Sequence, residues 1–149
     1  MTGIQFTVPN RYDNMLLKVF DGINLEKFYW KISESEVITK RAQLPLLQES
    51  FLCGTEFVKS VEAQEYYVIF LNLQAFYSEN EIMDITTLED FRSGTCQLIL
   101  LVTDSIFVEI FAKEEETIKK IAKNASHNEF KDIEFITEKN VSRRLFKVL

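Results

Sequence analysis

The chain has 149 residues, of which 46% are hydrophobic, 13% aromatic and 27% charged, and its formal net charge is -6 at pH 7. One domain of this length buries a sufficient core without disulfides or metals, and a total of four glycines and two prolines leaves little material for a linker. An acidic chain lacks the positive potential that binds phosphate backbones, so nucleic acid is excluded as a partner. We predict a single domain over residues 1–149.

The start of the chain and its cysteines indicate a cytoplasmic protein. The first five residues, Met1 to Gln5, form neither a basic nor an apolar segment, so we predict no signal peptide. No apolar run approaches the roughly 18 residues of a membrane-spanning helix, so we predict no membrane contact. Cys53 and Cys96 each adjoin apolar residues, which predicts two buried free thiols, with a disulfide between them left open.

The first third of the chain predicts three strands and one short helix. Alternating apolar residues at 4–8 indicate a half-buried strand, and helical spacing over 12–20 indicates an amphipathic helix. A second alternation at 28–32 predicts another strand. We expect it to turn at 33–35 into a partner strand at 36–39.

The middle of the chain predicts a helix on either side of a long strand, followed by a hairpin. Residues 55–61 and 87–93 have helical patterns, and the second starts with a motif similar to a capping box. Tyr66 to Phe76 is a long β-prone run. Leu98 to Val102 is continuously apolar, which predicts a strand covered on both faces, and a turn at Asp104 leads to its partner.

The last third predicts a helix and two strands. Residues 113–128 carry the clearest helical pattern, with glutamates first and lysines later, as the helix dipole favours. A strand follows at 132–137. We expect residues 145–148 to form an edge strand guarded by Arg143, Arg144 and Lys147.

These elements predict an α+β domain with a mainly antiparallel sheet and helices packed mostly on one face. From residue 66 onward, the order strand, helix, strand occurs twice. This order resembles the split βαβ arrangement.

The sequence offers no catalytic or metal-binding constellation. His127 is the single histidine, and with two cysteines it cannot supply a zinc site. Four isolated glycines build no phosphate-binding loop, so we predict no cofactor. Carboxylates remain the available acid–base groups, and each is most simply a turn former or a surface charge. We therefore favour a non-enzymatic protein, and catalytic residues remain unassigned.

Four residues are candidates for an interaction surface. Tyr29 lies on the opposite face of its strand from the core residue Trp30, so we expect it to be exposed. Glu34 and Glu36 flank the expected turn. Glu109 is the odd polar residue among aromatics in the hairpin, and it would either meet solvent or need a partner under a covering element.

Several segments carry a resemblance to a known family. The run from Tyr66 to Phe76, the helix start from Asp84 to Phe91, the run from Cys96 to Ser105 and the N-terminal run from Ile4 to Asn10 together resemble a small family of bacterial cytoplasmic proteins. The family comes mostly from Gram-positive species and is known only as a domain of unknown function. The resemblance implies a single domain of bacterial cytoplasmic origin, and it transfers no functional residue.

Three functions are consistent with the sequence. The favoured one is a protein-interaction or regulatory role, similar to that of an immunity protein, in which an acidic surface captures a basic partner. The second is a small-molecule-binding domain or a carboxylate-dependent enzyme with a pocket at one end of the sheet. The third is a structural homodimer, so a monomer and a homodimer both remain open.

Overall fold

A computed structural model describes residues 1–143 and 145–148, and it contains one seven-stranded sheet with the strand order β3-β2-β4-β5-β6-β1-β7. Every neighbouring pair is antiparallel. The strands are β1 (Gly3–Thr7), β2 (Tyr29–Thr39), β3 (Phe51–Cys53), β4 (Tyr66–Phe76), β5 (Leu98–Thr103), β6 (Phe107–Ala112) and β7 (Lys131–Ile136). The helices are α1 (Met15–Val19), α2 (Gly54–Glu62), α3 (Leu88–Ser93) and α4 (Glu115–His127), with 3-10 turns η1 (Leu25–Lys27) and η2 (Glu79–Glu81).

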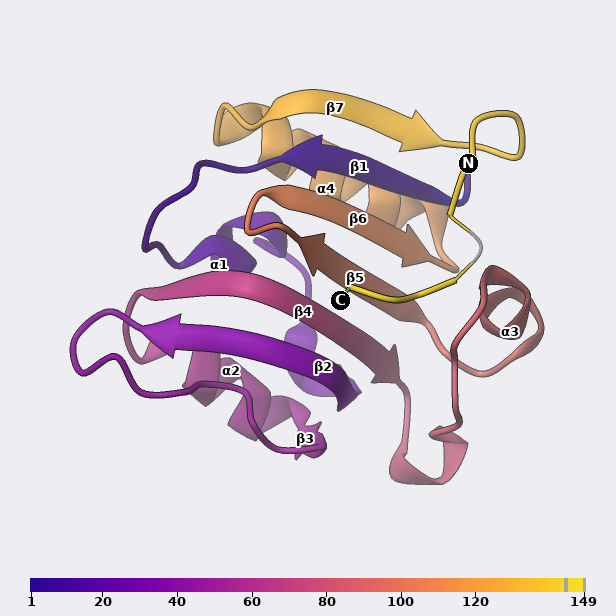
Figure 1. Ribbon diagram of the computed structural model, residues 1–149. Coiled ribbons are helices and arrows are strands. Elements are labelled where there is room, and N and C mark those ends of the chain that lie inside the picture. Colours follow the sequence, from indigo (N-terminus) through magenta and orange to yellow (C-terminus); the bar gives the residue numbers. More distant parts are fainter. Residues whose placement is uncertain (144, 149) are drawn as a thin grey trace.

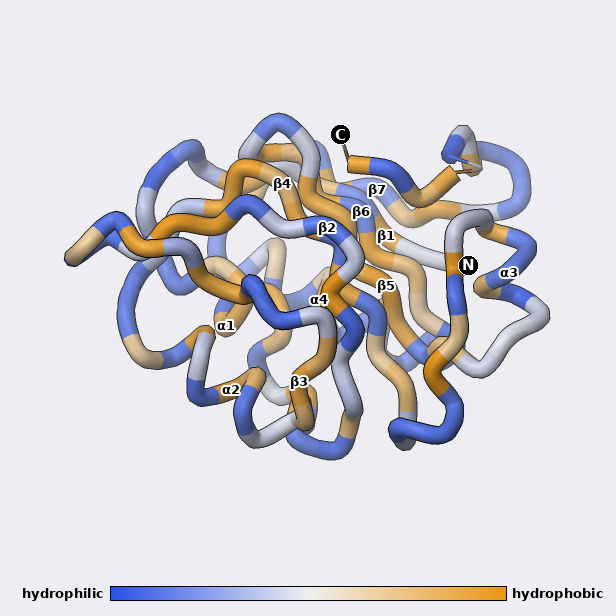
Figure 2. The backbone as a smooth tube through the Cα atoms, turned by 60° about the horizontal axis from the view of Figure 1, so that its bottom comes forward, coloured by the Kyte–Doolittle hydropathy of each residue, from blue (hydrophilic) through white to orange (hydrophobic). Residues whose placement is uncertain are grey.

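Three helices, α1, α2 and α4, lie behind the sheet in Figure 1, whereas α3 lies at one end of it. The main core lies between the sheet and these three helices, where Trp30 of β2 stacks on Phe57 of α2 with ring centroids 4.3 Å apart. The central strands are the hydrophobic part of the chain and the surrounding loops are hydrophilic (Figure 2). The predicted α+β class, with its antiparallel sheet, is confirmed. No helix within the described residues has the length and apolar character needed to cross a membrane.

The hairpin of β5 and β6 lies at the centre of the sheet, as predicted. Leu98 to Val102 are all at most 1% exposed. Asp104, Ser105 and Ile106 connect the paired residues Thr103 and Phe107, and Asp104 and Ser105 have φ values of 48° and 68°. Three-residue loops that include a left-handed position are a common hairpin connection. The short polar side chains at the turn tolerate this backbone.

The split βαβ order is present once. β6 and β7 both run antiparallel to β1, which lies between them, and α4 connects them. By contrast, β4 and β5 pair directly and antiparallel, so the earlier strand–helix–strand segment is not a split unit. The difference arises because α3 has only six residues and covers the end of the sheet rather than crossing it.

The predicted turn at residues 33–35 is wrong, because β2 continues from Tyr29 to Thr39. The register with β4 shifts twice, between Ile32 and Glu34 and between Glu36 and Val37. Each irregularity changes the face on which the following side chains lie. The polar run therefore stays in the strand while its carboxylates point away from the helices.

The predicted edge strand at 145–148 is also wrong: within the described residues, β3 and β7 are the edges of the sheet. The chain after β7 crosses the sheet face opposite the helices (Figure 1). Phe146 and Val148 are buried there at 3% and 6% exposure, which holds the segment on the sheet rather than beside it. Arg144, one of the expected guards, lies outside the described residues.

The two cysteines differ. Cys96 is buried as predicted, and burial raises the pKa of its thiol to about 12. Cys53 is exposed, so its predicted burial is wrong: it lies on β3, a three-residue edge strand. Both are free cysteines.

Candidate functional site

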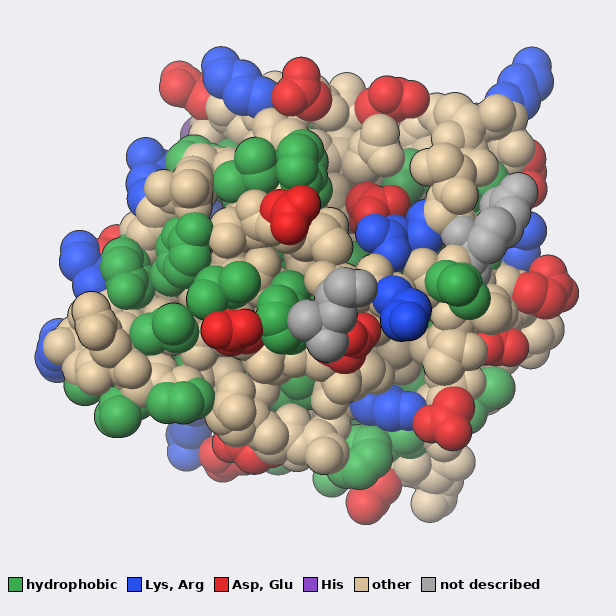
Figure 3. Space-filling model, in the orientation of Figure 1, with side chains coloured by type: hydrophobic (Ala, Val, Ile, Leu, Met, Phe, Trp, Pro, Cys, Tyr) green, Lys and Arg blue, Asp and Glu red, His purple; other side chains and the backbone are tan. Residues whose placement is uncertain are grey.

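The face of the sheet opposite α1, α2 and α4 is only partly covered, and we call it the open face. A second hydrophobic cluster lies on it, beneath α3 and beneath residues 141–143 and 145–148, which we call the strap. Figure 3 views this face and shows hydrophobic side chains gathered over its left half, with acidic side chains among them. The open face therefore divides into a covered part and an uncovered part.

The strap lies on a row of side chains that runs across five strands. Cross-strand pairing places these residues side by side. The row, which we call the covered row, consists of Glu34, Asn72, Leu101, Glu109 and Gln5. It contains two carboxylates and two amides, so it offers charged and polar groups to a segment lying above it.

An ion pair fixes the first part of the strap. Arg143 donates from Nε to Oε1 of Glu109 over 2.8 Å, and the two side chains are only 19% and 17% exposed. The Nη1 of Arg143 also donates to the carbonyls of Leu145 at 3.0 Å and Lys147 at 2.7 Å. Arg143 thus joins the sheet to the strap's own backbone, and charge-assisted hydrogen bonds of this kind are the stronger ones.

Backbone hydrogen bonds and one aromatic ring fix the last part of the strap. Asn72 donates from Nδ2 to the Phe146 carbonyl over 3.1 Å, and the Phe146 amide donates to the Thr86 carbonyl over 2.9 Å. The Phe146 ring lies 5.3 Å from the Phe111 ring, centroid to centroid. The Val148 amide donates to Oε1 of Glu34 over 3.4 Å. The covered row therefore binds an extended, basic and aromatic segment through its side chains and its backbone.

A buried amide lies next to this row. Gln74 is fully buried and donates from Nε2 to the Ile85 carbonyl over 3.1 Å and to Oδ1 of Asn72 over 3.2 Å. Its Oε1 has no hydrogen-bond partner among the described residues. An unpaired buried acceptor is costly, so this part of the face retains capacity for one more donor.

A second row lies alongside the strap and is uncovered. Glu36 of β2 pairs with Phe70 of β4, and Phe107 of β6 pairs with Thr103 of β5 and with Thr7 of β1. The β4–β5 pairing, continued by one residue, places Phe70 beside Thr103. We call Glu36, Phe70, Thr103, Phe107 and Thr7 the open row. Phe107 is 46% exposed.

A hollow of about 420 Å³ lies at one end of the open row. Its lining is mostly polar around the exposed Phe107 ring and includes the carboxylates of Glu109 and Asp132. The lining residues are Gln5, Phe6, Thr7, Thr103, Phe107, Val108, Glu109, Asp132 and Ser142. An exposed aromatic ring beside acidic groups suits a cationic or mixed apolar and basic side chain.

The four interaction candidates from the sequence all lie on the open face, but in different rows. Glu34 and Glu109 belong to the covered row and contact the strap. Glu36 is exposed in the open row. Tyr29 is half-buried at the far end of β2, opposite Phe76, away from the other three.

Sequence reasoning missed the residues that complete this surface. Arg143 was assigned to guard an edge, although its guanidinium pairs with Glu109. Asn72 and Gln74 lie within the predicted strand from Tyr66 to Phe76, and both are among the few buried polar residues. Two amides spaced two residues apart on one face of an otherwise apolar strand were the available signal.

Metal binding finds no support in the described part of the chain, where no group of three or more Cys, His, Asp or Glu side chains could hold an ion. His127 is exposed at the end of α4. Asp84, one of the carboxylates left available by the sequence, pairs with Lys31 at 2.8 Å.

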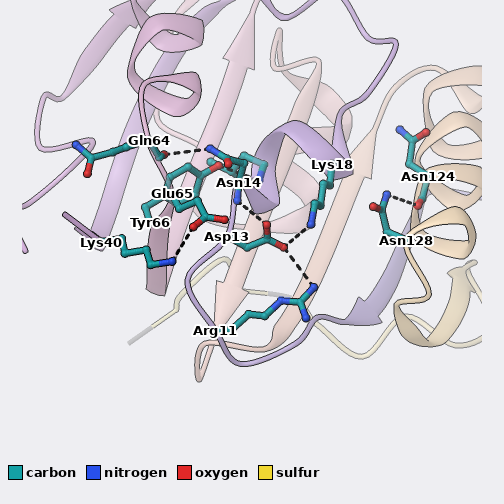
Figure 4. A network of polar contacts seen from close by, with 11 residues as sticks. Arg11, Asp13, Asn14, Lys18, Lys40, Gln64, Glu65, Tyr66, Asn124 and Asn128 are labelled. Atoms are coloured by element: carbon teal, nitrogen blue, oxygen red, sulfur yellow. Dashed lines mark hydrogen bonds and ion pairs between the residues drawn. The ribbon is translucent and has the colours of Figure 1, made fainter.

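A polar network at one end of the sheet is structural (Figure 4). Asp13 accepts from Lys18 over 2.7 Å and from the Asn14 amide over 2.9 Å, and Arg11 lies 3.7 Å away. Burial raises the pKa of Asp13, but the Lys18 and Asn14 hydrogen bonds and both nearby cations outweigh it, so that pKa lies below its ordinary value. The charges of this network compensate one another, and it braces α1 against β4.

Comparisons with known proteins agree with the resemblance. The family described as "Protein of unknown function (DUF2691)" matches residues 1–147. The chain belongs to this family. The chain is 29% identical over 145 residues to the uncharacterized protein YncE of Bacillus subtilis strain 168, and the match covers 95% of each chain. No solved structure matches the chain.

Proposed function

We propose that this DUF2691 protein is a non-enzymatic binding protein whose open row docks an extended basic segment of a partner protein beside the strap. The observation that carries the proposal is the strap itself. The covered row already holds a segment containing Arg143, Phe146 and Lys147, through a carboxylate, an amide and an apolar surface. The protein thus contains one example of the ligand chemistry that this sheet face accepts.

The open row offers similar chemistry and has no occupant among the described residues. Glu36 supplies an exposed carboxylate, Asp104 at the adjoining turn is also exposed, and Phe107 presents almost half of its side chain to solvent. Aromatic side chains that meet arginine or lysine are frequent at the centre of interfaces. The net charge of -6 would speed the encounter with a basic partner and make its rate salt-dependent.

A peptide with the sequence of residues 141–148 is a direct probe. Titrated into the full-length chain at low salt, it should bind saturably, and Glu36→Lys should weaken binding by about tenfold, since one charge-assisted contact is lost and a repulsive one is gained. Glu62→Lys on α2 makes the same change in net charge on the helix side and should leave the affinity unchanged.

Two outcomes would contradict the proposal. If the peptide fails to bind at millimolar concentration, or if Glu36→Lys and Glu62→Lys weaken it equally, the open row is not the docking site. Light scattering at two protein concentrations tests the homodimer alternative. If the protein is a dimer and Phe107→Ala dissociates it, a second copy of the chain occupies this face instead of a basic partner.

A further inference from the structure

A lysine-rich groove lies on the other side of the molecule, between the loop from α1 to η1 and the helix α4. The groove encloses about 590 Å³. One wall consists of Gly22, Ile23, Asn24 and Lys27, and the other of Glu116, Thr117, Lys119, Lys120 and Lys123. Four lysines thus line one hollow in a chain whose net charge is -6.

The carboxylates near this groove do not neutralise it. Within the described residues, Glu116 is the acidic group of the lining, and it lies 3.3 Å from Lys119. The other three lysines have no carboxylate within ion-pair distance in that part of the chain. Lys119 and Lys123 are also spaced i,i+4 on α4, a like-charge arrangement that weakens a helix. The dipole of α4 favours cations in its last turn, where the basic residue is His127, so it accounts neither for the lysines of this helix nor for Lys27 on the facing wall.

The groove is held in a fixed shape. Asn124 of α4 donates from Nδ2 to the carbonyls of Val19 and Asp21, both over 2.9 Å. Lys120 donates from Nζ to the Gly22 carbonyl over 2.9 Å. Gly22 has φ of +78°, and a Cβ at this position would lie 3.3 Å from that Nζ, so glycine allows the lysine to approach the loop. The two walls are therefore joined before any ligand arrives, which reduces the entropy lost on binding.

An aromatic shelf adjoins the groove. A small hollow beside it shares Ile23, Lys27 and Thr117 with the groove and is also lined by Phe28, Tyr77 and Glu114. The Tyr77 hydroxyl donates to Oε1 of Glu114 over 3.3 Å. These two rings stack with centroids 5.8 Å apart, and Tyr77 is 47% exposed. An exposed ring next to clustered ammonium groups suits a ligand with an aromatic body and phosphate groups.

We propose that this groove binds a small phosphorylated molecule, with its phosphates on the lysines of both walls and its aromatic part against Tyr77. The ligand would bridge η1 and α4. Lysine binds phosphate as a compact charge and needs no glycine-rich loop, so the site is compatible with a chain that has only four glycines. This site is independent of the open face.

Calorimetric titration of the full-length chain with inorganic pyrophosphate and with ADP tests the proposal. Both should bind saturably and compete with each other. Lys27→Gln and Lys123→Gln, one on each wall, should each weaken binding by about tenfold, because each removes a charge-assisted contact. Lys139→Gln removes the same charge outside the groove and should change the affinity less than about twofold. Tyr77→Ala should weaken ADP but not pyrophosphate.

The proposal would be overturned by three results. The first is absence of saturable pyrophosphate binding at millimolar concentration in low salt. The second is equal weakening by Lys139→Gln and the groove substitutions, which would indicate non-specific charge attraction. The third is binding confined to nucleic acid or to anionic vesicles, which would make the lysines part of a surface for macromolecules. If ADP and pyrophosphate bind with equal affinity, Tyr77 does not contact the ligand.

Discussion

The open face and the lysine groove arrange opposite charges in different ways. On the open face, two carboxylates of the covered row, Glu34 and Glu109, already hold the strap, so the charge there is used within the chain. In the groove, three of four lysines have no carboxylate partner among the described residues. A low pI is a property of the whole chain, and it does not reveal that lysines are concentrated in one groove. The two regions also show that burial decides whether a charge serves the fold or remains available to a ligand.

The largest expected effect is on the strap. Phe146→Ala should lower the free energy of unfolding by about 3 kcal/mol, because the ring is 3% exposed and packs on Phe111. Urea denaturation measures this loss. Leu145→Ala, at a neighbouring residue that is 57% exposed, should change it by less than about 0.5 kcal/mol. Equal small losses would mean that the strap leaves the sheet in solution, and the covered row would then be as free as the open row.

The ion pair beneath the strap should have the next largest effect. Arg143→Met leaves the Glu109 carboxylate without its partner at 17% exposure, and we expect a loss of about 1–2 kcal/mol. Adding Glu109→Met to Arg143→Met should recover part of the lost stability. A double-mutant cycle therefore measures the coupling free energy between Arg143 and Glu109.

Arg92→Met tests the same chemistry at a more exposed pair, where Glu138 is 67% exposed, and should cost less than about 1 kcal/mol. Equal costs at the two pairs would contradict the distinction between buried and available charge.

The Asp13 network should contribute less, and its contribution should depend on pH. The folded-state pKa of Asp13 is lowered, so its stabilisation is fully present above the unfolded pKa of about 3.9 and is lost as the pH falls through the folded value. Asp13→Asn should cost about 1 kcal/mol at pH 7, and the difference from wild type should shrink below about pH 4.

Thermal unfolding across this pH range measures the difference. The Asp13→Asn variant also tests whether the groove depends on the Asp13 network, because the chain leads from α1 into Gly22 of the groove wall. If pyrophosphate affinity at pH 7 stays unchanged in Asp13→Asn, the groove does not depend on this brace.

The smallest effect on stability is expected at Cys53. A thiol reagent at pH 8 should label one thiol per native chain, because Cys53 is exposed while burial raises the pKa of Cys96 to about 12. Cys53→Ser should abolish native labelling and change stability by less than about 0.5 kcal/mol. Labelling of both thiols in the native protein would show that the hydrophobic cluster of the open face, which contains Cys96, opens readily.

Local patterns predicted most of the elements. The strand Tyr66–Phe76 was predicted with the bounds that it has, and Thr87 and Asp90 form the predicted capping box of α3. These succeeded because a long β-prone run and a cap are both decided within a few residues. The continuation of β2 through 33–35 was missed because the polar run resembles a turn, and its place in the sheet is decided by pairing with β4.

The candidate site was harder to predict because its contacts are long-range. Glu109 and Arg143 are 34 residues apart, and Asn72 and Phe146 are 74 apart. The sequence showed that a covered Glu109 would need a partner, but it could not say which residue would lie above it. The strap mixes apolar and polar residues without a regular period, and this composition suits an edge strand as well as a segment crossing a sheet face. The groove joins Lys27 to α4, so no local pattern could indicate it.

The position of β1 has a consequence for the order in which the protein folds. β1 precedes the six other strands in the chain, yet within the described residues it pairs only with β6 and β7. Ile4 can pair with Ile110 only after the long segment between them has been synthesised. Loops of that length make folding slow, and an apolar strand is exposed during the wait. The strap follows all seven strands in the chain, so the covered row of the open face stays without the strap until every strand of the sheet has been synthesised.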